Sequence, residues 1–383
     1  MISALLAIET SCDETAAAVL AETGDPLRPW TIHANIVASQ TSIHREWGGV
    51  VPELASRQHV RDICGVVEAA LDRARVTPAG LGAVAVTQGP GLVGSLLVGV
   101  AFAKAFAWSL DLPVVPVHHL AGHIESLVLA HGELPMPAAV LVVSGGHTSL
   151  FFVPEPGVYQ LVGRTRDDAA GEAYDKVAKL LGLGYPGGPS VDRLAHEGNP
   201  HAYDFPTARL THADRNVPVP TAPEGLLPRE IARRVDFSFS GLKTAVLRHV
   251  REAAGAGPTG TAASADSLGG SLARGQIADI CASFQRVVVD ALLDRTFEAA
   301  RWLGARSIGI AGGVSANRGL RAEAEARAAR HGIPVFVPPM SLSTDNAAMI
   351  GAAALRKLRD GATRRYDFNA EAALPLQPVA RDP

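Results

Sequence analysis

Two segments of this sequence share one layout, and this internal likeness constrains the fold more than any other feature. Residues 4–20 and residues 138–153 each consist of an apolar run, a short polar turn and a second apolar run. A segment of this kind is typical of two strands joined as a hairpin. Because each hairpin opens one half of the chain, we predict a duplicated α/β architecture with two lobes and a central cleft.

Strand and helix patterns alternate between and after these hairpins. Apolar runs at residues 82–87, 112–117 and 307–311 are typical of strands, and a helical pattern extends from a Gly-rich turn at residues 88–95 to Trp108. Such alternation favours a mostly parallel sheet.

The domain boundaries follow from the hairpins and from changes in composition. A stretch rich in Gly, Ala, Ser and Thr is typical of a flexible surface loop, and the end of the chain shows little periodicity. We predict an N-terminal lobe at residues 1–137, a C-terminal lobe at 138–355 with a flexible loop at 255–270, and a tail at 356–383.

Composition limits the location and the partners of the protein. The formal net charge is -3, so no global field attracts nucleic acid, and an RNA partner has to meet a local basic patch. The three cysteines include no Cys-x-x-Cys pair, which suits a reducing compartment. The apolar start runs directly into Glu9 without a basic leader, and no apolar stretch reaches the ~18 residues that cross a membrane. We therefore expect a cytoplasmic protein with no membrane partner.

A pair of histidines follows the strand-like run at 112–117. His119 and His123 are four residues apart, so a helix that begins there places both imidazoles on one face. Two such imidazoles are typical of a clamp for zinc, iron or another transition ion. His118 points to a different face. The zinc protease motif H-E-x-x-H has a Glu inside as general base, whereas the interior here is Leu-Ala-Gly.

A candidate third ligand stands near the far end of the sequence. Asp345 precedes the last helical pattern, and two histidines with one carboxylate leave open positions for water or substrate. The alternative is that Asp345 only caps that helix.

Gly-rich turns after strands offer backbone N–H groups to an anion. The turn at residues 142–148 contains Gly145 and Gly146, which remove Cβ bulk. The turn at 312–317 ends in Asn317, which is suited to hydrogen-bond a sugar hydroxyl or a base edge. The alternatives are simple tight turns and, for Asn317, a helix cap.

Eight motifs of this chain lie in a characteristic order, at residues 9–15, 117–123, 142–148, 171–179, 185–188, 237–244, 312–317 and 344–349. In this order they resemble those of the tRNA N6-adenosine threonylcarbamoyltransferases, the TsaD family, which comprises the bacterial transferase subunit and its archaeal and eukaryotic counterpart. The resemblance extends from residue 3 to about residue 355. It implies the actin-like, sugar-kinase-like (ASKHA) fold, in agreement with the two hairpins.

The resemblance also implies a reaction and partners. The threonylcarbamoyl group would pass from threonylcarbamoyl-AMP to N6 of the adenosine at position 37 in tRNAs that read codons beginning with A. Bacterial members work with an inactive paralogue, TsaB, and a small ATPase, TsaE. Because this chain has a weak basic footprint, such partners are expected to help hold the tRNA.

The family's functional positions are carried over residue by residue. The metal ligands would be His119, His123 and Asp345, which hold one divalent ion per subunit, Fe²⁺ with Zn²⁺ as the alternative. The substrate-contacting positions would be Val142, Val143, Ser144, Gly145, Gly146, Asp175, Gly188, Asp192 and Asn317. Taken alone, Asp175 and Asp192 are typical of a solvated surface.

A general base is also expected near the first hairpin. Asp13 and Glu14 in its turn are candidates to take the proton of the attacking amine, with the departing phosphate as the alternative.

Three other functions compete with the transferase. A metallopeptidase is disfavoured by the missing Glu between the histidines. A sugar kinase or chaperone-type ATPase is suggested by fold alone, and fold does not imply function. A non-catalytic scaffold like the inactive paralogue would be expected to lack the histidine pair.

Overall fold

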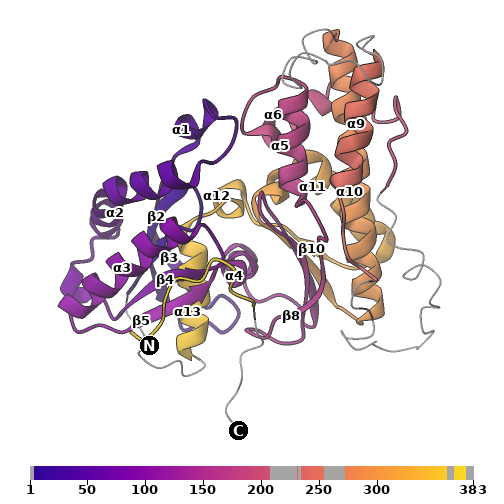
Figure 1. Ribbon diagram of the computed structural model, residues 1–383. Coiled ribbons are helices and arrows are strands. Elements are labelled where there is room, and N and C mark those ends of the chain that lie inside the picture. The colour runs from indigo at the N-terminus through magenta and orange to yellow at the C-terminus, as the bar shows by residue number, and fades with distance from the viewer. Residues whose placement is uncertain (1–3, 208–230, 232–233, 254–271, 360–365, 377–383) are drawn as a thin grey trace. The chain divides into compact units, whose positions relative to one another are not determined.

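The computed structural model describes residues 4–207, 231, 234–253, 272–359 and 366–376 (Figure 1). The chain divides into two compact units. Unit 1 comprises residues 1–136, 153–159 and 338–383, and unit 2 comprises residues 137–152 and 160–337.

Unit 1 is built on a five-stranded sheet. Its strands in spatial order are β3 (Trp30–Ser39), β2 (Glu14–Glu22), β1 (Leu5–Glu9), β4 (Ala83–Gly89) and β5 (Val114–His118). The pairs β1–β2 and β2–β3 are antiparallel, whereas β1–β4 and β4–β5 are parallel. All five residues of β1 are buried, because helices cover both faces of the sheet.

Helices α2 (Pro52–Ala74) and α3 (Val93–Ser109) cover one face of this sheet, where Ile8 of β1 packs in one core with Val67 and Val100. Helices α4 (His119–His131) and α13 (Ala347–Arg359) belong to the other side. A Cβ on Gly351 of α13 would lie 2.3 Å from a Leu20 methyl, so glycine permits this close packing. The short elements are α1 (Thr41–Arg45), η1 (Pro78–Gly80) and α12 (Met340–Ser343).

Unit 2 is built on a second five-stranded sheet. Its strands in spatial order are β10 (Val335–Phe336), β9 (Ser307–Ala311), β6 (Ala138–Val143), β7 (Thr148–Val153) and β8 (Gln160–Arg164). The pairs β6–β9 and β9–β10 are parallel, and β7–β8 is antiparallel. The helical elements are α5 (Ala170–Leu180), α6 (Gly187–Ala195), α9 (Ser240–Ala253), α10 (Arg274–Trp302), η3 (Gly313–Ala316) and α11 (Arg318–His331).

The two sheets repeat one strand order. Read from β8, the second sheet runs β8-β7-β6-β9-β10, which matches β3-β2-β1-β4-β5 of the first. This match confirms the predicted duplicated α/β fold. The expectation of a mostly parallel sheet was wrong: each sheet is mixed, because the hairpin that opens each half pairs its own strands before the parallel strands are added.

The compact units differ from the predicted lobe boundaries at the C-terminal end. Residues 338–355, placed by the sequence in the second lobe, belong to unit 1, where α13 packs on β1 and β2. The described part of the tail, residues 366–376, packs against the same unit, and Phe368 is buried in its core. The predicted flexible loop at 255–270 lies outside the described residues.

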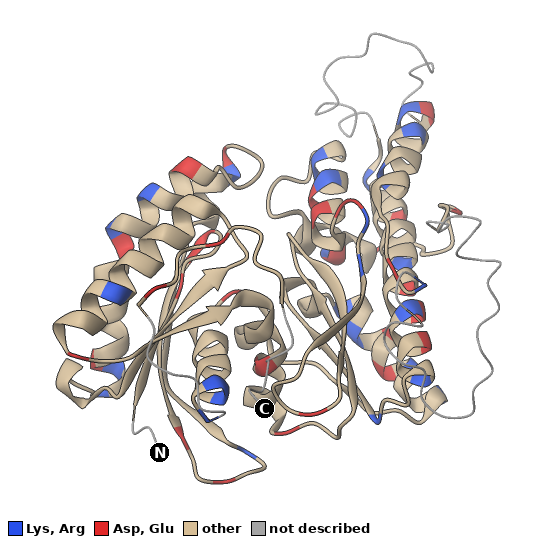
Figure 2. Ribbon diagram, turned by 60° about the horizontal axis from the view of Figure 1, so that its bottom comes forward, with Lys and Arg blue, Asp and Glu red and all other residues tan. Residues whose placement is uncertain are grey.

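Charged residues lie mainly on the helices. Figure 2 shows segments of both signs interspersed along them, whereas the strands carry few charges. This mixed pattern agrees with the net charge of -3. Within the part of the chain that the structure describes, no helix has the length and apolarity needed to cross a bilayer.

Candidate metal centre and anion-binding turns

The histidine pair is positioned by the junction of β5 and α4. His118 is the N-cap of α4, and its Nδ1 accepts the N–H of Leu120 at 3.1 Å. Its Nε2 donates to the carbonyl of Leu374 at 3.0 Å. Both ring nitrogens of His118 therefore bind backbone groups, and the His118 ring is not part of the His119 and His123 pair. The helix that starts there places His119 and His123 on one face, as predicted, with ring centroids 4.7 Å apart.

The structure brings Asp345 to both histidines. Its Oδ1 lies 3.2 Å from Nε2 of His123 and 3.6 Å from Nε2 of His119. One ligand atom from each of the three side chains lies within 4.8 Å of the others. The three residues that the sequence suggested as metal ligands therefore converge within unit 1.

A neighbour of Asp345 caps the helix that follows it. α13 begins at Ala347, and the side-chain oxygen of Asn346 accepts the N–H of Met349 at 3.2 Å. The neighbouring residue thus fills the capping role that was the alternative for Asp345.

A fourth residue, Glu9, was not identified from the sequence. It ends β1 and is fully buried, and its Oε2 accepts from Nδ1 of His119 at 3.0 Å and from the Thr87 hydroxyl at 2.8 Å. Its Oε1 accepts the N–H of Ser11 at 2.5 Å. A carboxylate that holds one nitrogen of a histidine leaves the other nitrogen directed to a metal. The signal in the sequence was an acidic residue at the carboxyl end of the first strand.

The electrostatics of this region favour a positive charge. Burial alone lowers the pKa of His119, but the carboxylates of Asp345 and Glu9 outweigh it and raise that pKa to about 9. Burial lowers the pKa of His123. Burial and the carboxylates of Asp13 and Asp345 raise the pKa of Glu14 well above its usual value. Carboxylates that lie close together repel one another when they are ionised, and this repulsion raises their pKa values. A bound cation would relieve the repulsion, so such a cluster is suited to a cation.

The donor set fits a transition metal. Neither ring nitrogen of His123 meets a hydrogen-bond partner in good geometry among the described residues, although the ring is fully buried. A buried imidazole nitrogen without a well-aligned hydrogen bond is costly, and a cation shared with Asp345 would offset that cost. Two imidazoles and one carboxylate are a ligand set typical of zinc or iron.

The candidate bases lie in the same region of unit 1. Asp13 is 8% exposed, and its backbone carbonyl accepts the N–H of Gln40 at 3.0 Å. Glu14 accepts a weak hydrogen bond from the Ser39 hydroxyl at 3.4 Å. Their role as general bases stays a prediction.

In unit 2, the predicted anion cradle connects β6 to β7. Val142 and Val143 are fully buried in β6, so they support the turn that follows them. The N–H of Ser144 is already donated to the carbonyl of His147 at 2.8 Å. The exposed Gly145 and Gly146 are therefore the residues whose N–H groups can receive an anion.

Two glycines hold this turn against neighbouring loops. The N–H of Gly171 donates to the carbonyl of Ser144 at 3.2 Å, and a Cβ at Gly171 would lie 2.6 Å from the same oxygen. Gly312 has φ +93, and a Cβ there would lie 2.4 Å from the carbonyl of Val143. Glycine is required at Gly171 to bring α5 against the turn after β6, and at Gly312 to bring the end of β9 against the end of β6.

The remaining predicted substrate contacts form two local arrangements in unit 2. Asp175 accepts the N–H of Gly187 at 2.7 Å, and Gly188 has open space where a Cβ would be. Asp192 and Asn317 are both bonded to Gln285, which the sequence did not single out. Asn317 also caps α11, since its Oδ1 accepts the N–H of Leu320, so the predicted cap role is confirmed.

The motif at residues 237–244 has a structural task in unit 2. Asp167 accepts from the hydroxyls of Ser238 and Ser240 and from the N–H of Phe239 at 2.8 Å. These bonds outweigh burial and lower the pKa of Asp167. The motif thus ties a carboxylate from a distant loop to the start of α9.

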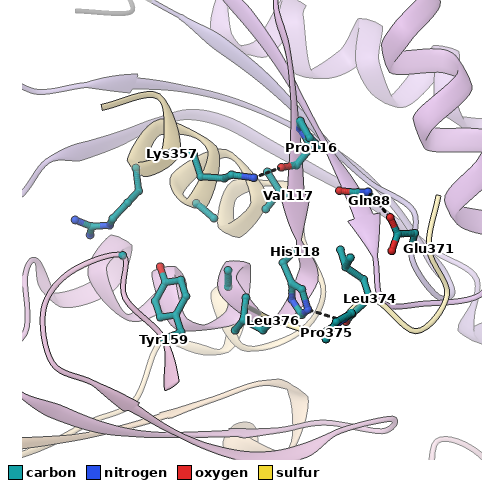
Figure 3. A pocket seen from close by; sticks show the side chains of 14 residues that line it. Gln88, Pro116, Val117, His118, Tyr159, Lys357, Glu371, Leu374, Pro375 and Leu376 are labelled. Atoms are coloured by element: carbon teal, nitrogen blue, oxygen red, sulfur yellow. Dashed lines mark hydrogen bonds between the residues drawn. The ribbon is translucent and has the colours of Figure 1, made fainter. Parts of the chain in front are cut away.

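Unit 1 also contains a cavity of about 470 Å³ beside β5 and the last turn of α13 (Figure 3). Residues 374–376 of the C-terminal segment form part of its wall. This segment is held by the bond from His118 to Leu374 and by the Gln88 amide, which donates to Glu371 at 3.0 Å. The C-terminal segment therefore supports His118, the residue that precedes the helix carrying the histidine pair.

This chain is similar to known proteins over nearly its whole length. The model of the family TsaD, tRNA N6-adenosine threonylcarbamoyltransferase, matches residues 31–352. A protein named tRNA N6-adenosine threonylcarbamoyltransferase from Anaeromyxobacter dehalogenans (strain 2CP-C) is 50% identical over 373 residues, which cover 97% of this chain and 99% of the relative. One of the same name from Geobacillus thermodenitrificans is 47% identical over 376 residues, with 97% and 96% covered.

The solved structures show a likeness of fold. Full-length HypF in the phosphate- and nucleotide-bound form aligns with a TM-score of 0.54 at 14% sequence identity, over 94% of this chain and 47% of that chain. Identity this low shows the fold alone.

Proposed function

Because the chain belongs to the tRNA N6-adenosine threonylcarbamoyltransferase family, a family of transferases that modify tRNA, we propose that it acts on the adenosine at position 37. The donor is threonylcarbamoyl-AMP, and the acceptors are tRNAs that read codons beginning with A. The products are tRNA carrying t6A and free AMP. The convergence of His119, His123 and Asp345 is the observation that carries this proposal.

The chemistry calls for positioning and charge stabilisation. N6 of adenine attacks the carbamoyl carbonyl carbon, a C–N bond forms, and the C–O bond to the phosphate breaks. The donor is a mixed anhydride and is already activated, but the lone pair of the exocyclic amine is delocalised into the ring. Holding the amine against the carbonyl and stabilising charge on the departing phosphate therefore give the largest gains.

We assign the metal ligands to His119, His123 and Asp345, with Fe²⁺ as the proposed ion and Zn²⁺ as the alternative. A divalent ion there supplies Lewis-acid stabilisation of phosphate charge. Glu9 holds Nδ1 of His119 and so keeps its Nε2 directed toward Asp345. Asp13, with Glu14 beside it, is the proposed acceptor of the amine proton. In single turnover with donor binding intact, Asp13→Asn should slow the transfer step, and an unchanged rate would eliminate this role.

We assign the contacts with the donor's AMP and threonyl parts to unit 2. The N–H groups of Gly145 and Gly146 bind phosphate oxygens. Asp192 and Asn317 hold the nucleoside, and Asp175 contacts the threonyl or ribose end.

The charge distribution supports the need for partner proteins. A net charge of -3 with interspersed signs gives little general attraction to tRNA (Figure 2). We propose that the paralogue TsaB and the ATPase TsaE assist, and that the complex works in the cytoplasm, where tRNA is modified.

The test measures the modified nucleoside and the metal separately. Purified protein is incubated with tRNA, threonine, bicarbonate, ATP and the partner proteins, and the tRNA nucleosides are analysed by mass spectrometry. We expect t6A with the unchanged protein and with His131→Ala, an exposed histidine at the end of the same helix. His119→Ala should lose both t6A and bound metal. Full t6A formation by His119→Ala would refute the assignment of the metal centre.

A further inference from the structure

A chain of hydrogen bonds joins two of the proposed nucleoside contacts through a third side chain. The amide nitrogen of Gln285, on α10, donates to Oδ1 of Asp192 at 3.2 Å. The amide oxygen of Gln285 accepts from Nδ2 of Asn317 at 2.7 Å. The outer oxygen of Asp192 accepts from Nε of Arg318 at 2.9 Å. We call these four residues the Gln285 relay.

The chemistry of its two ends fixes the direction of every bond in the relay. At one end, Oδ1 of Asn317 must accept the backbone N–H of Leu320, which turns Nδ2 toward Gln285. At the other end, the Asp192 carboxylate can only accept, so the Gln285 nitrogen must face it. A glutamine is therefore the side chain that satisfies both neighbours at once.

The relay is shielded from water except at Arg318, whose side chain is 56% exposed. Gln285 and Asp192 are each 8% exposed and Asn317 is 9% exposed, so water cannot easily replace these bonds. Two buried hydroxyls in unit 2, those of Tyr174 and Ser315, have no partner among the described residues. Burial, and after it the carboxylate of Asp192, raises the pKa of the Tyr174 phenol. Buried polar groups of this kind usually have a partner, and a bound ligand would provide one.

We propose that Gln285 is a positioning residue for the nucleoside part of the donor, an adenine nucleotide. It holds the Asn317 amide and the Asp192 carboxylate in one fixed orientation, so that one N–H of Asn317 and the remaining lone pairs of Asp192 are presented to the ligand. This inference rests on the proposed function of the chain. A glycine at position 319 leaves room for the relay, because a Cβ there would lie 2.7 Å from the Gln285 amide nitrogen.

The alternative is that the relay only joins α6, α10 and α11. Two variants at Gln285 and one control separate these possibilities in the metal-loaded protein with its partners. Gln285→Leu removes both bonds with little change in volume. Gln285→Glu keeps the acceptor for Asn317 but places a second carboxylate against Asp192. The control Thr296→Val removes a buried hydroxyl of α10 that bonds within its own helix, to the carbonyl of Leu292.

The measurements are AMP affinity by calorimetry, and KM and kcat for threonylcarbamoyl-AMP. We expect Gln285→Leu to weaken AMP binding and raise KM by roughly 10- to 100-fold, with a much smaller change in kcat. Thr296→Val should leave both constants close to those of the unchanged protein. Metal content should be the same in all variants, because the metal ligands belong to unit 1.

The Gln285→Glu variant adds a pH readout that a purely structural role would not produce. Two carboxylates in contact raise the pKa of one of them. Below that pKa one of the two carboxyl groups carries a proton, so a hydrogen bond between residue 285 and Asp192 can form again. The ratio of the variant's KM to that of the unchanged protein should therefore fall as the pH is lowered from about 8 to about 6.

Two results would overturn the inference. One is AMP affinity in Gln285→Leu within about threefold of the unchanged protein. The other is a relative KM of Gln285→Glu that does not vary with pH. Failure of the proposed function is distinguishable, because the unchanged protein itself would then neither bind AMP nor form t6A.

Discussion

Replacing Glu9 by glutamine tests whether this buried carboxylate orients His119, the histidine that we propose as a metal ligand. Glu9 accepts three hydrogen bonds, from the Ser11 N–H on one oxygen and from Thr87 and His119 on the other. A glutamine of the same shape has one oxygen. If that oxygen faces His119, the amide nitrogen is forced against the Ser11 N–H, and if it faces Ser11, two donors lose their acceptor.

Both orientations carry a cost that can be measured. A buried donor without an acceptor costs about 1–3 kcal/mol, so the free energy of unfolding should fall by about that amount. In the orientation that keeps the bond to His119, that bond loses its negatively charged acceptor, which roughly halves its strength. Removing a carboxylate behind a histidine ligand typically weakens metal affinity by roughly 10- to 100-fold, or about 1.4–2.7 kcal/mol.

The assay is competition for Zn²⁺ or Fe²⁺ between the protein and a chromophoric chelator. The control is Thr87→Val, which removes a neutral donor from the same oxygen of Glu9 and should change metal affinity by less than about threefold. Should Glu9→Gln bind the metal as tightly as Thr87→Val does, the orienting role of Glu9 is wrong.

Three further predictions concern stability, and each is measured by chemical denaturation. Arg356→Met leaves Glu125 buried without its 2.8 Å ion pair and should cost about 3–5 kcal/mol, much of it recovered when Glu125→Gln is added; a cost under about 1 kcal/mol would contradict this. Gly312→Ala places a side chain at φ +93 and against the carbonyl of Val143, and should cost about 1–3 kcal/mol or more, whereas an unchanged free energy of unfolding would show that the turn can relax. Burial lowers the pKa of His59, so the stability it contributes is present above the unfolded-state pKa of about 6.5 and is lost as pH falls through the lower folded value. In His59→Gln the unfolding free energy should therefore decline less steeply below about pH 6.5, and an equally steep decline would refute this assignment.

The duplicated fold could be predicted because its signal is local. The strands β1, β2, β6 and β7 are visible as apolar runs on either side of polar turns, and the actin-like type expected from the motifs agrees with both sheets and with the family. The mixed strand directions were missed because the alternation of strands and helices indicates parallel pairs. The antiparallel pairs that begin with the opening hairpin of each half were not added to that expectation. The packing of the tail on unit 1 was not predicted, because Phe368 and Ala370 lack the periodicity that marks a longer buried element.

The candidate site was only partly predictable for a related reason. Helical spacing alone places His119 and His123 on one face. Asp345 could be suggested only as a carboxylate that would complete the ligand set, a role that the family resemblance also implies, since no local pattern connects residues so far apart. Glu9 and Gln285 were missed because their importance lies in partners from other elements, His119 and Asn317. A side chain that acts by holding a residue distant in the sequence leaves no recognisable spacing pattern around it.

The matching strand orders have a consequence for how such a protein can diverge. The end of β1 and the end of β6 occupy the same place in the repeated unit, yet one carries the carboxylate of Glu9 and the other the Gly-rich turn after Ser144. Because the strands that frame this place are the same in both units, each unit can carry its own functional groups there. The side chains at this place in one unit can therefore change by a few substitutions while the framework of both units survives.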